Sequence, residues 1–360
     1  MLSGIKVIDF SQYLPAPHTT LRLAELGAEV IKVESPVGDP SRAPSGEEEM
    51  GYIFQAQNRN KKSIVLNLKD EADKEWALQL IAAADVVVES YRPGVADRLG
   101  IGYKEALSVN EKVIYCSLSG YGRTETMRHL GGHDLNYLSI SGVLSQLKDQ
   151  TGRPIQPGTQ LADFIGGITA SEAILGALVK RERTGEPSYL DISITDSLFP
   201  FMSNHFLIEG YTGEQNGADK LGGKYVCYYI YETKDGRYVT LGALEPKFWK
   251  NLCHALNKES WLTGHFSKTT DDNPVFKELK EVFANRTLAE WTQFSMEVDC
   301  CLAPILETSE VVNHPLVKSR NLVFTKQGVN YTATRFSEQE SKFSPPPKLS
   351  QHADELKQLK

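Results

Sequence analysis

The sequence predicts an α/β fold, in which a large domain with a doubly wound, mostly parallel, Rossmann-like sheet is followed by a smaller α+β domain. In the first half of the chain, short apolar runs alternate with helix-like segments, which is the βαβ pattern of parallel sheets. Beyond residue 221 a hairpin signal and a series of helical patterns replace that alternation. The length of 360 residues also favours two domains, since one domain ordinarily holds about 100–200 residues.

Four apolar runs of the first half are predicted strands. They are Ile5–Phe10, Glu29–Val33, Asp85–Glu89 and Lys112–Leu118. A helical stretch that ends at Gly27 separates the first two runs, and a helical pattern at Asp70–Ala83 precedes the third. Helices between consecutive strands are expected to cover both faces of a parallel sheet.

The turn after the first predicted strand lacks a dinucleotide-binding motif. Ser11–Pro17 contains no Gly-x-Gly-x-x-Gly, so the backbone does not approach a pyrophosphate there in the usual way. A nicotinamide- or flavin-dependent dehydrogenase is therefore disfavoured.

A long helix is predicted from Asp163 to about Arg183. Lys180 and Arg181 stand in its last turn and Gly185 follows it, and both features favour a helix C-terminus. Asp163 would then lie near the positive end of the helix dipole, which favours the carboxylate form of its side chain.

The second half begins with a hairpin signal, in which Tyr225–Glu232 and Arg237–Leu241 flank a turn with Asp235-Gly236. Helices are predicted after it at Lys247–Leu256, Val275–Ala284 and Leu288–Val298. We therefore expect a large domain over 1–200, a linker over 201–221, a small α+β domain over 222–320 and a C-terminal segment over 321–360.

The composition excludes several classes of protein. Hydrophobic residues make up 41% and charged residues 24% of the chain, as in ordinary soluble globular proteins. The net charge of −7 disfavours nucleic acid as a partner, and neither a signal peptide nor an uninterrupted membrane-length apolar run is visible. The five cysteines are scattered, so neither disulfides nor a metal site are indicated, and a cytoplasmic location is expected.

Two short segments carry the chemistry. Gly132–Tyr137 reads Gly-His-Asp-Leu-Asn-Tyr and Leu161–Gly167 reads Leu-Ala-Asp-Phe-Ile-Gly-Gly, so that His133 and Asp163 each stand at the apparent start of a helix, 163 − 133 = 30 residues apart. An imidazole ordinarily titrates at about 6.5 and an aspartate at about 3.9, so the two can hold opposite protonation states near neutral pH. This pairing is typical of an enzyme that moves protons.

At this spacing the two segments closely resemble the α-methylacyl-CoA racemases, a branch of the family III CoA-transferase (CaiB/BaiF) superfamily. Ser119–Gly122 and Cys301–Leu306 extend the resemblance over nearly the whole chain. The resemblance implies interconversion of the epimers of a 2-methylacyl-CoA through an enolate. It also implies that His133 and Asp163 are the acid/base pair, one on each face of the α-carbon.

The resemblance implies three supporting residues. The backbone amide of Asp134 would stabilise the developing oxyanion, with Tyr137 nearby, because unpaired N–H groups at a helix start favour negative charge. Glu245 matches a glutamate that orients the catalytic histidine. Each also has a purely structural interpretation, since Asp134 and Glu245 are acids at helix starts and Tyr137 is an aromatic of the core type.

Coenzyme A is expected as part of the substrate, and no separate cofactor is expected. In the superfamily, residues along the adenine and phosphates match Leu66, Asn67, Leu68, Lys69, Ser90, Tyr91, Arg92 and Arg98. Arginine and lysine suit phosphates and an aromatic ring can stack on adenine, although single basic residues are more often solvated surface charges. Arg59, Lys61 and Lys62 form another basic cluster of this ambiguous kind.

The superfamily also implies an interlocked homodimer, in which Glu245 reaches His133 across the dimer and the C-terminal segment returns to the large domain. One departure concerns the coenzyme. Racemases commonly carry an arginine after the acid that ends the second strand, whereas Glu34 is followed here by Ser35, and Gly38–Arg42 looks more like the transferase branch.

Two other functions stay open. In a CoA-transferase of the same fold, Asp163 would act as a nucleophile that carries the acyl group and then CoA covalently. That chemistry does not require His133 or Glu245, so their presence favours the racemase. A catalytically silent acyl-CoA-binding protein is the third interpretation, against which the intact His133 and Asp163 argue.

Overall fold

The computed structural model describes residues 1–43, 50–123, 126–149, 151–215, 217, 219–326, 328–334 and 343–357. The chain forms two compact units, of which the first combines Met1–Met202 with Leu322–Lys360 and the second is Ser203–Asn321. Residues 216 and 218 of the expected linker, and 327, 335–342 and 358–360 of the expected C-terminal segment, lie outside the described residues.

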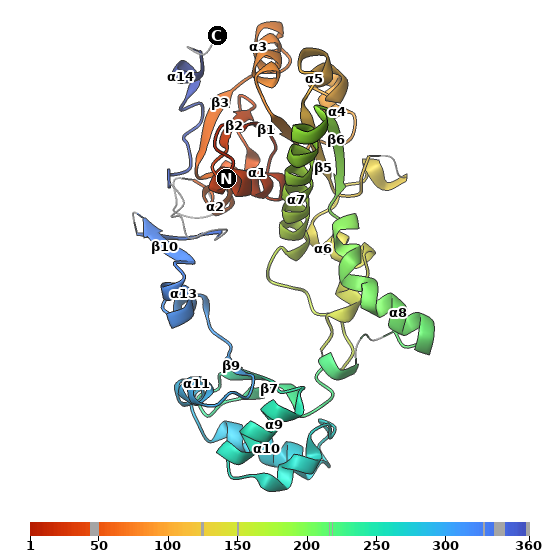
Figure 1. The fold of residues 1–360 in the computed structure, drawn as a ribbon, viewed down its shortest axis with the longest axis vertical. Coiled ribbons are helices and arrows are strands. Elements are labelled where there is room, and N and C mark those ends of the chain that lie inside the picture. Colours follow the sequence, from red (N-terminus) through yellow and green to blue (C-terminus); the bar gives the residue numbers. More distant parts are fainter. Residues whose placement is uncertain are drawn as a thin grey trace. The chain divides into compact units, whose positions relative to one another are not determined.

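A six-stranded parallel sheet forms the centre of the first unit (Figure 1), and its order is β3-β2-β1-β4-β5-β6. Its strands are β1 (Lys6–Phe10), β2 (Glu29–Glu34), β3 (Lys61–Val65), β4 (Val86–Glu89), β5 (Ile114–Ser119) and β6 (Ser188–Ser193). This order confirms the predicted Rossmann-like fold class, and it reverses direction between β1 and β4, where ligands bind in such sheets.

Sequence analysis missed two of the six strands. The edge strand β3 begins with Lys61 and Lys62, and β6 alternates polar residues with Tyr189, Leu190 and Ile192, so neither is a plain apolar run. An edge strand is flanked by only one neighbouring strand, so fewer of its residues are enclosed. It therefore tolerates more polar residues than a central strand.

Helices cover both faces of the sheet, as alternation along the strands requires. Val7 packs into one core with α1 (Pro15–Glu25) and α7 (Leu161–Thr184), whereas the next residue, Ile8, packs into another with α3 (Glu71–Ala82) and α5 (Tyr103–Val109). The other helices near the sheet are α2 (Tyr52–Asn58), α4 (Val95–Arg98) and α6 (Asp134–Ile140).

Helix α7 confirms the long helix predicted from Asp163, and it starts two residues earlier, at Leu161. With a mean hydropathy of 1.4 it is long and apolar enough to span a membrane by length and composition alone. Its apolar residues, among them Ala170 and Ile174, belong to the core that α7 shares with α1 and the sheet. This packing accounts for the composition of the helix.

The C-terminal segment lies along β3. Backbone N–H groups of Ser63 and Val65 donate to His352 Nδ1 at 3.1 Å and to Ser350 Oγ at 3.2 Å. The segment contains the hairpin β10 (Val323–Lys326) and β11 (Val329–Thr332) and ends with α14 (Ala353–Lys357). It therefore covers an edge of the sheet that would otherwise present unpaired backbone groups.

The second unit contains a three-stranded antiparallel sheet of β7 (Tyr228–Glu232), β8 (Tyr238–Gly242) and β9 (Leu302–Pro304). Three tryptophans, Trp249, Trp261 and Trp291, are buried in its core. The helices of this unit are α8 (Ser203–Thr212), α9 (Pro246–Ala255), α10 (Pro274–Ala284), α11 (Leu288–Glu297), α12 (Thr308–Val311) and α13 (Pro315–Ser319).

Residues 203–212, which we expected in a linker, form helix α8, since no glycine or proline interrupts the segment before Gly210. Short 3-10 helices complete the structure. They are η1 (Pro40–Arg42), η2 (Thr126–His129), η3 (Val143–Gln146), η4 (Asp196–Met202), η5 (Asp219–Leu221) and η6 (Glu259–Gly264).

Candidate active site

The carboxyl edge of the parallel sheet carries most of the predicted site residues. At the point where the strand order reverses, the loops after β1 and β4 meet, and the Gln12 N–H donates to Ser90 Oγ at 3.0 Å. Ser90 is followed by Tyr91 and Arg92, so these three coenzyme candidates lie where an open α/β sheet binds its ligands.

The first turns of α6 and α7 are bonded to each other. His133 is the N-cap of α6, and its backbone N–H donates to Asn136 Oδ1 at 3.0 Å. The backbone N–H of Asp163, in the first turn of α7, donates to Asp134 Oδ2 at 3.1 Å. Packing therefore brings together the two helix starts that carry His133 and Asp163, as the sequence motifs predict.

Asp163 has an unusual protonation equilibrium. Burial raises the pKa of its carboxyl group to about 7, and the neighbouring charge of Asp134 acts in the same direction. The helix dipole favours the carboxylate form, but desolvation and the like charge of Asp134 outweigh it here. Near neutral pH the group is about half protonated, as a general acid/base requires.

A tyrosine and a glycine shape the segment before His133. The Tyr137 hydroxyl donates to the carbonyl of Gly132 at 2.7 Å, and burial raises the pKa of this phenol, so it stays protonated. A Cβ atom on Gly132 would lie 2.7 Å from both the Tyr121 hydroxyl and a ring carbon of Tyr137. Only glycine therefore fits at 132 without displacing a ring.

Arg92 approaches the same segment. One of its guanidinium nitrogens lies 3.3 Å from the place where a Cβ atom of Gly131 would stand. The Arg92 side chain is exposed, as is that of Arg98 at the end of α4, whereas the Tyr91 ring is half-buried against the core and burial raises its pKa. Of the coenzyme candidates, Arg92 thus reaches the segment before His133.

The four coenzyme candidates after β3 stand apart from that group. Leu66 is only 2% exposed and Leu68 packs beside it, so both side chains belong to the core. Asn67 and Lys69 are exposed in the turn before α3, where the Lys69 N–H donates to Asn67 Oδ1 at 3.3 Å. The strands β2 and β1 separate this turn from the end of β4.

The basic cluster of Arg59, Lys61 and Lys62 is engaged in ion pairs. Lys61 Nζ lies 3.2 Å from Asp9 Oδ2 with both side chains fully buried, and Arg59 is buried against Glu25. Lys62 Nζ pairs with Glu29 and Glu355 at 2.6 Å and 2.7 Å. Protein carboxylates neutralise the charges of this cluster, which favours a structural role for it over phosphate binding.

A buried ionic network supports the loop after β1, and sequence analysis missed it. Lys32 Nζ donates to the carbonyl of Ser11 at 2.7 Å and pairs with Asp39 at 3.0 Å. Asp39 Oδ1 accepts from the Tyr13 N–H at 3.2 Å, and Lys32 holds the Asp39 pKa below its usual range although burial opposes this. The signal in the sequence was a lysine in the middle of the apolar run 29–34.

Arg42 packs against Glu34 and an aromatic ring. Arg42 Nε and Nη2 donate to the two oxygens of the Glu34 carboxylate at 2.6 Å and 2.7 Å, and the guanidinium lies over the Phe54 ring. In the segment that departs from the racemases, Arg42 is thus bound to a carboxylate of the protein.

Glu245 lies in the second unit. It is the N-cap of α9, its side chain is exposed, and Pro246 begins the helix. The sequence also places Glu245 at a helix start, directly before a proline.

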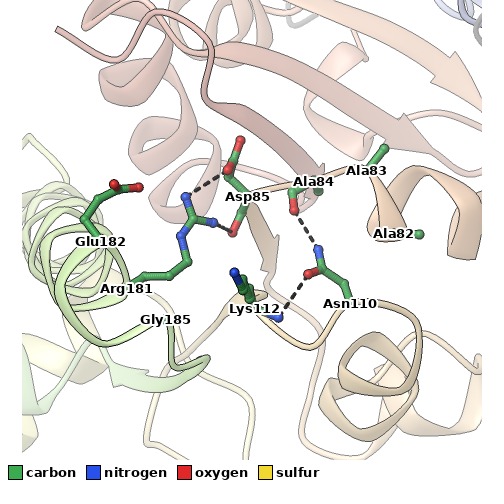
Figure 2. A pocket seen from close by; sticks show the side chains of 9 residues that line it. All are labelled: Ala82, Ala83, Ala84, Asp85, Asn110, Lys112, Arg181, Glu182 and Gly185. Carbon is green, nitrogen blue, oxygen red and sulfur yellow. Dashed lines mark hydrogen bonds and ion pairs between the residues drawn. The ribbon is translucent and has the colours of Figure 1, made fainter.

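The opposite, amino edge of the sheet contains an open cavity of about 480 Å³ (Figure 2). Arg181 Nη2 donates to the Asp85 carboxylate at 2.8 Å, and Asn110 Nδ2 donates to the carbonyls of Ala84 at 2.7 Å and Ile81 at 3.0 Å. Its main polar groups therefore bind one another and hold the start of β4 to the end of α7.

Comparisons with known proteins agree with this architecture. The chain matches CoA-transferase family III over residues 2–353. It is 32% identical to succinyl-CoA:glutarate CoA-transferase of Mus musculus over 98% of this chain and 84% of the relative. It is also 32% identical to alpha-methylacyl-CoA racemase of Homo sapiens over 91% and 83%.

A solved CAIB/BAIF family protein from Brucella suis superposes with a TM-score of 0.88 at 26% identity, over 99% of this chain and 98% of that one. Racemases and CoA-transferases thus resemble the chain about equally, and the match to the family spans almost every residue. The chain belongs to CoA-transferase family III.

Proposed function

We propose that the protein interconverts the epimers of a 2-methylacyl-CoA by moving a proton from one face of the α-carbon to the other. The observation that carries this proposal is a carboxyl group with a pKa of about 7 at a helix start that is bonded to the helix start of a histidine. A carboxylic acid that is only half ionised near neutral pH can both accept and donate the proton that racemisation requires.

In this mechanism one member of the pair removes the α-proton as a base, and the electron pair of the C–H bond delocalises into the thioester carbonyl to give an enolate. The other member then donates its proton to the opposite face, so that the pair retains one proton in total. His133 and Asp163 exchange these roles between the two directions. The oxyanion is stabilised by the backbone N–H of Asp134, which as the first residue of α6 has no acceptor within the helix.

Tyr137 acts through the loop rather than on the substrate. Its hydroxyl hydrogen is directed at the Gly132 carbonyl, so we assign it the role of holding the residue before His133 in place. Glu245 is proposed to orient His133, from a partner subunit.

The coenzyme portion of the substrate is proposed to bind along the loops after β4 and β3. Arg92 and Arg98 are exposed and carry the charge that diphosphate requires, and Ser90 and Tyr91 lie beside Arg92. Asn67 and Lys69 are exposed, whereas Leu66 and Leu68 would contribute backbone groups because their side chains are in the core.

A homodimer is proposed from the surface of α8. None of the residues of α8 is buried. Three large apolar side chains lie on it, and Phe206, Leu207 and Tyr211 are 53%, 61% and 87% exposed. Large apolar side chains gathered on one helix favour a protein partner, and a second copy of the chain fits the superfamily. Sizing chromatography is expected to give about twice the chain mass of 40.1 kDa, and a fully active monomer would contradict the proposal.

The second candidate is a CoA-transferase in which Asp163 attacks the thioester. Two observations favour it, namely the transferases among the relatives and the segment 38–42 that departs from the racemases. Against it stand His133 and Glu245, which that chemistry does not require.

The test is incubation with 2-methylbutanoyl-CoA in deuterated water. Incorporation of α-deuterium without an acceptor acid, lost in both His133→Gln and Asp163→Asn, is the expected result. CoA exchange between an acyl-CoA and a free carboxylate, lost in Asp163→Asn but kept in His133→Gln, would establish the transferase instead. If the protein binds CoA but shows neither activity, the interpretation as a catalytically silent acyl-CoA-binding protein is supported instead.

A further inference from the structure

The loop after β1 contains an exposed aromatic residue in a strained conformation. Tyr13 has a φ of +66°, in the left-handed region that bulky side chains rarely adopt, and its side chain is 56% exposed. Packing of the ring therefore does not account for the strain.

Three polar contacts of residues 11–13 hold this conformation. The carbonyl of Ser11 accepts from the buried Lys32 ammonium at 2.7 Å, the Gln12 N–H donates to Ser90 at 3.0 Å, and the Tyr13 N–H donates to Asp39 at 3.2 Å. A strained residue persists only where its surroundings determine it in this way, and such residues gather at functional sites.

The packing of α1 against α7 places this loop near Asp163. A Cβ atom on Gly167 would lie 2.5 Å from the carbonyl of Pro15, and Thr19 Oγ1 donates to the Gly167 carbonyl at 3.0 Å. Further along, Arg22 Nε donates to Ser171 Oγ at 3.0 Å, so the two helices run in the same direction.

The first residue of α1, Pro15, therefore lies level with Gly167 of α7; Asp163 is one helical turn before Gly167, and Tyr13 comes just before Pro15. On its other side the loop touches Ser90 through Gln12. The loop that carries Tyr13 thus contacts Ser90 after β4 and leads directly into the end of α1 that packs against α7, one helical turn from Asp163.

We propose that the ring of Tyr13 packs against the acyl-thioester end of the bound acyl-CoA and contributes to the choice of acyl group. The proposal rests on the proposed function, since it assumes that Asp163 faces the α-carbon. The flat face of a tyrosine ring that a strained backbone presents to solvent is suited to cover an apolar chain, while the hydroxyl at its tip can stay hydrogen-bonded to water.

The experiment compares Tyr13→Gly and Tyr13→Phe by calorimetric binding of 2-methylbutanoyl-CoA and of free CoA, which needs no turnover. In Tyr13→Gly the Kd for the acyl-CoA is expected to rise about tenfold, while the Kd for free CoA stays within about twofold. The Tm is maintained or rises by up to about 4 °C, because glycine adopts a positive φ without strain. Tyr13→Phe keeps the ring and is expected to bind both compounds like the unmodified protein.

Asn257→Gly is the matched control, since Asn257 also has a positive φ, of 53°, after α9. It is expected to change neither Kd. Unaltered acyl-CoA binding in Tyr13→Gly would overturn the proposal, and so would an equal loss for acyl-CoA and free CoA or a loss of the same size in Tyr13→Phe. If the unmodified protein binds acyl-CoA but incorporates no deuterium, the proposed racemisation fails while this test of Tyr13 still stands.

Discussion

The two edges of the parallel sheet use charged residues in opposite ways. At the amino edge, Arg181 and Asp85 neutralise each other beside an open cavity (Figure 2). At the carboxyl edge, Arg92 and His133 are exposed and Asp163 titrates near pH 7. The charges beside the amino-edge cavity are thus already paired, whereas the carboxyl edge retains groups that can bind an anion or exchange protons.

The same contrast exists within the carboxyl edge itself. Lys32 and Asp9 are completely buried; Lys32 binds the carbonyl of Ser11, and Asp9 pairs with Lys61, whose side chain reaches it from the first residue of β3. They stabilise the loop after β1, which presents Tyr13. The buried, paired charges hold this loop in place, whereas exposed charges beside them remain available to bind a ligand.

The largest expected effect separates two aspartates, one from each edge. Asp163→Asn is expected to reduce α-deuterium exchange by about 10²- to 10⁴-fold, because it removes one acid/base group. Asp85→Asn is expected to leave exchange within about twofold and to lower the free energy of unfolding by about 1–3 kcal/mol through loss of the Arg181 contact. Exchange kinetics and urea denaturation measure the two effects, and an equal loss of exchange in both variants would remove the distinction between the edges.

A pair of glycines gives the next largest effect. In Gly132→Ala the new Cβ atom meets Tyr121 and Tyr137, so His133 shifts and kcat is expected to fall about 10- to 100-fold. In Gly185→Ala, at the amino-edge cavity, nothing lies within 4 Å of the new atom, but the φ of +71° costs about 1 kcal/mol of stability. Steady-state kinetics and thermal unfolding distinguish them, and normal kcat in Gly132→Ala would speak against the loop geometry.

Two arginines sharpen the comparison further. Arg92→Gln is expected to raise KM for the acyl-CoA about tenfold with little change in kcat, since one charge-assisted phosphate contact is lost. Arg181→Gln is expected to leave KM unchanged, because Arg181 is engaged with Asp85. Kinetics at two salt concentrations test this, and an unchanged KM in Arg92→Gln would place the diphosphate elsewhere.

The smallest expected effect concerns pH. A pair that shares one proton is active between its two macroscopic pKa values, so kcat/KM should follow a bell-shaped profile. Asp134→Asn removes the like charge, which lowers the Asp163 pKa below about 7 and moves the acidic limb to lower pH. The shift should stay under about one unit because burial is the larger cause. A limb that moves to higher pH would contradict this assignment.

Sequence analysis found the features that depend on neighbours along the chain. The Rossmann-like fold class follows from the alternation of Ile5–Phe10 and later runs with helical patterns, and α7 begins within two residues of the predicted start. It missed β3, whose first residue Lys61 is charged yet fully buried. A charge suggests solvent unless its partner is known, and Asp9 is 52 residues away.

By itself the sequence determined that His133 and Asp163 stand at helix starts, because capping and apolar periodicity are local properties. The tertiary structure decided their chemistry. The pKa of Asp163 depends on burial and on Asp134, which is 29 residues earlier in the chain, and the ion pair of Lys61 depends on a carboxylate of another strand. Desolvation and Coulomb interaction are set by distances in space, so they become defined only when the chain has folded.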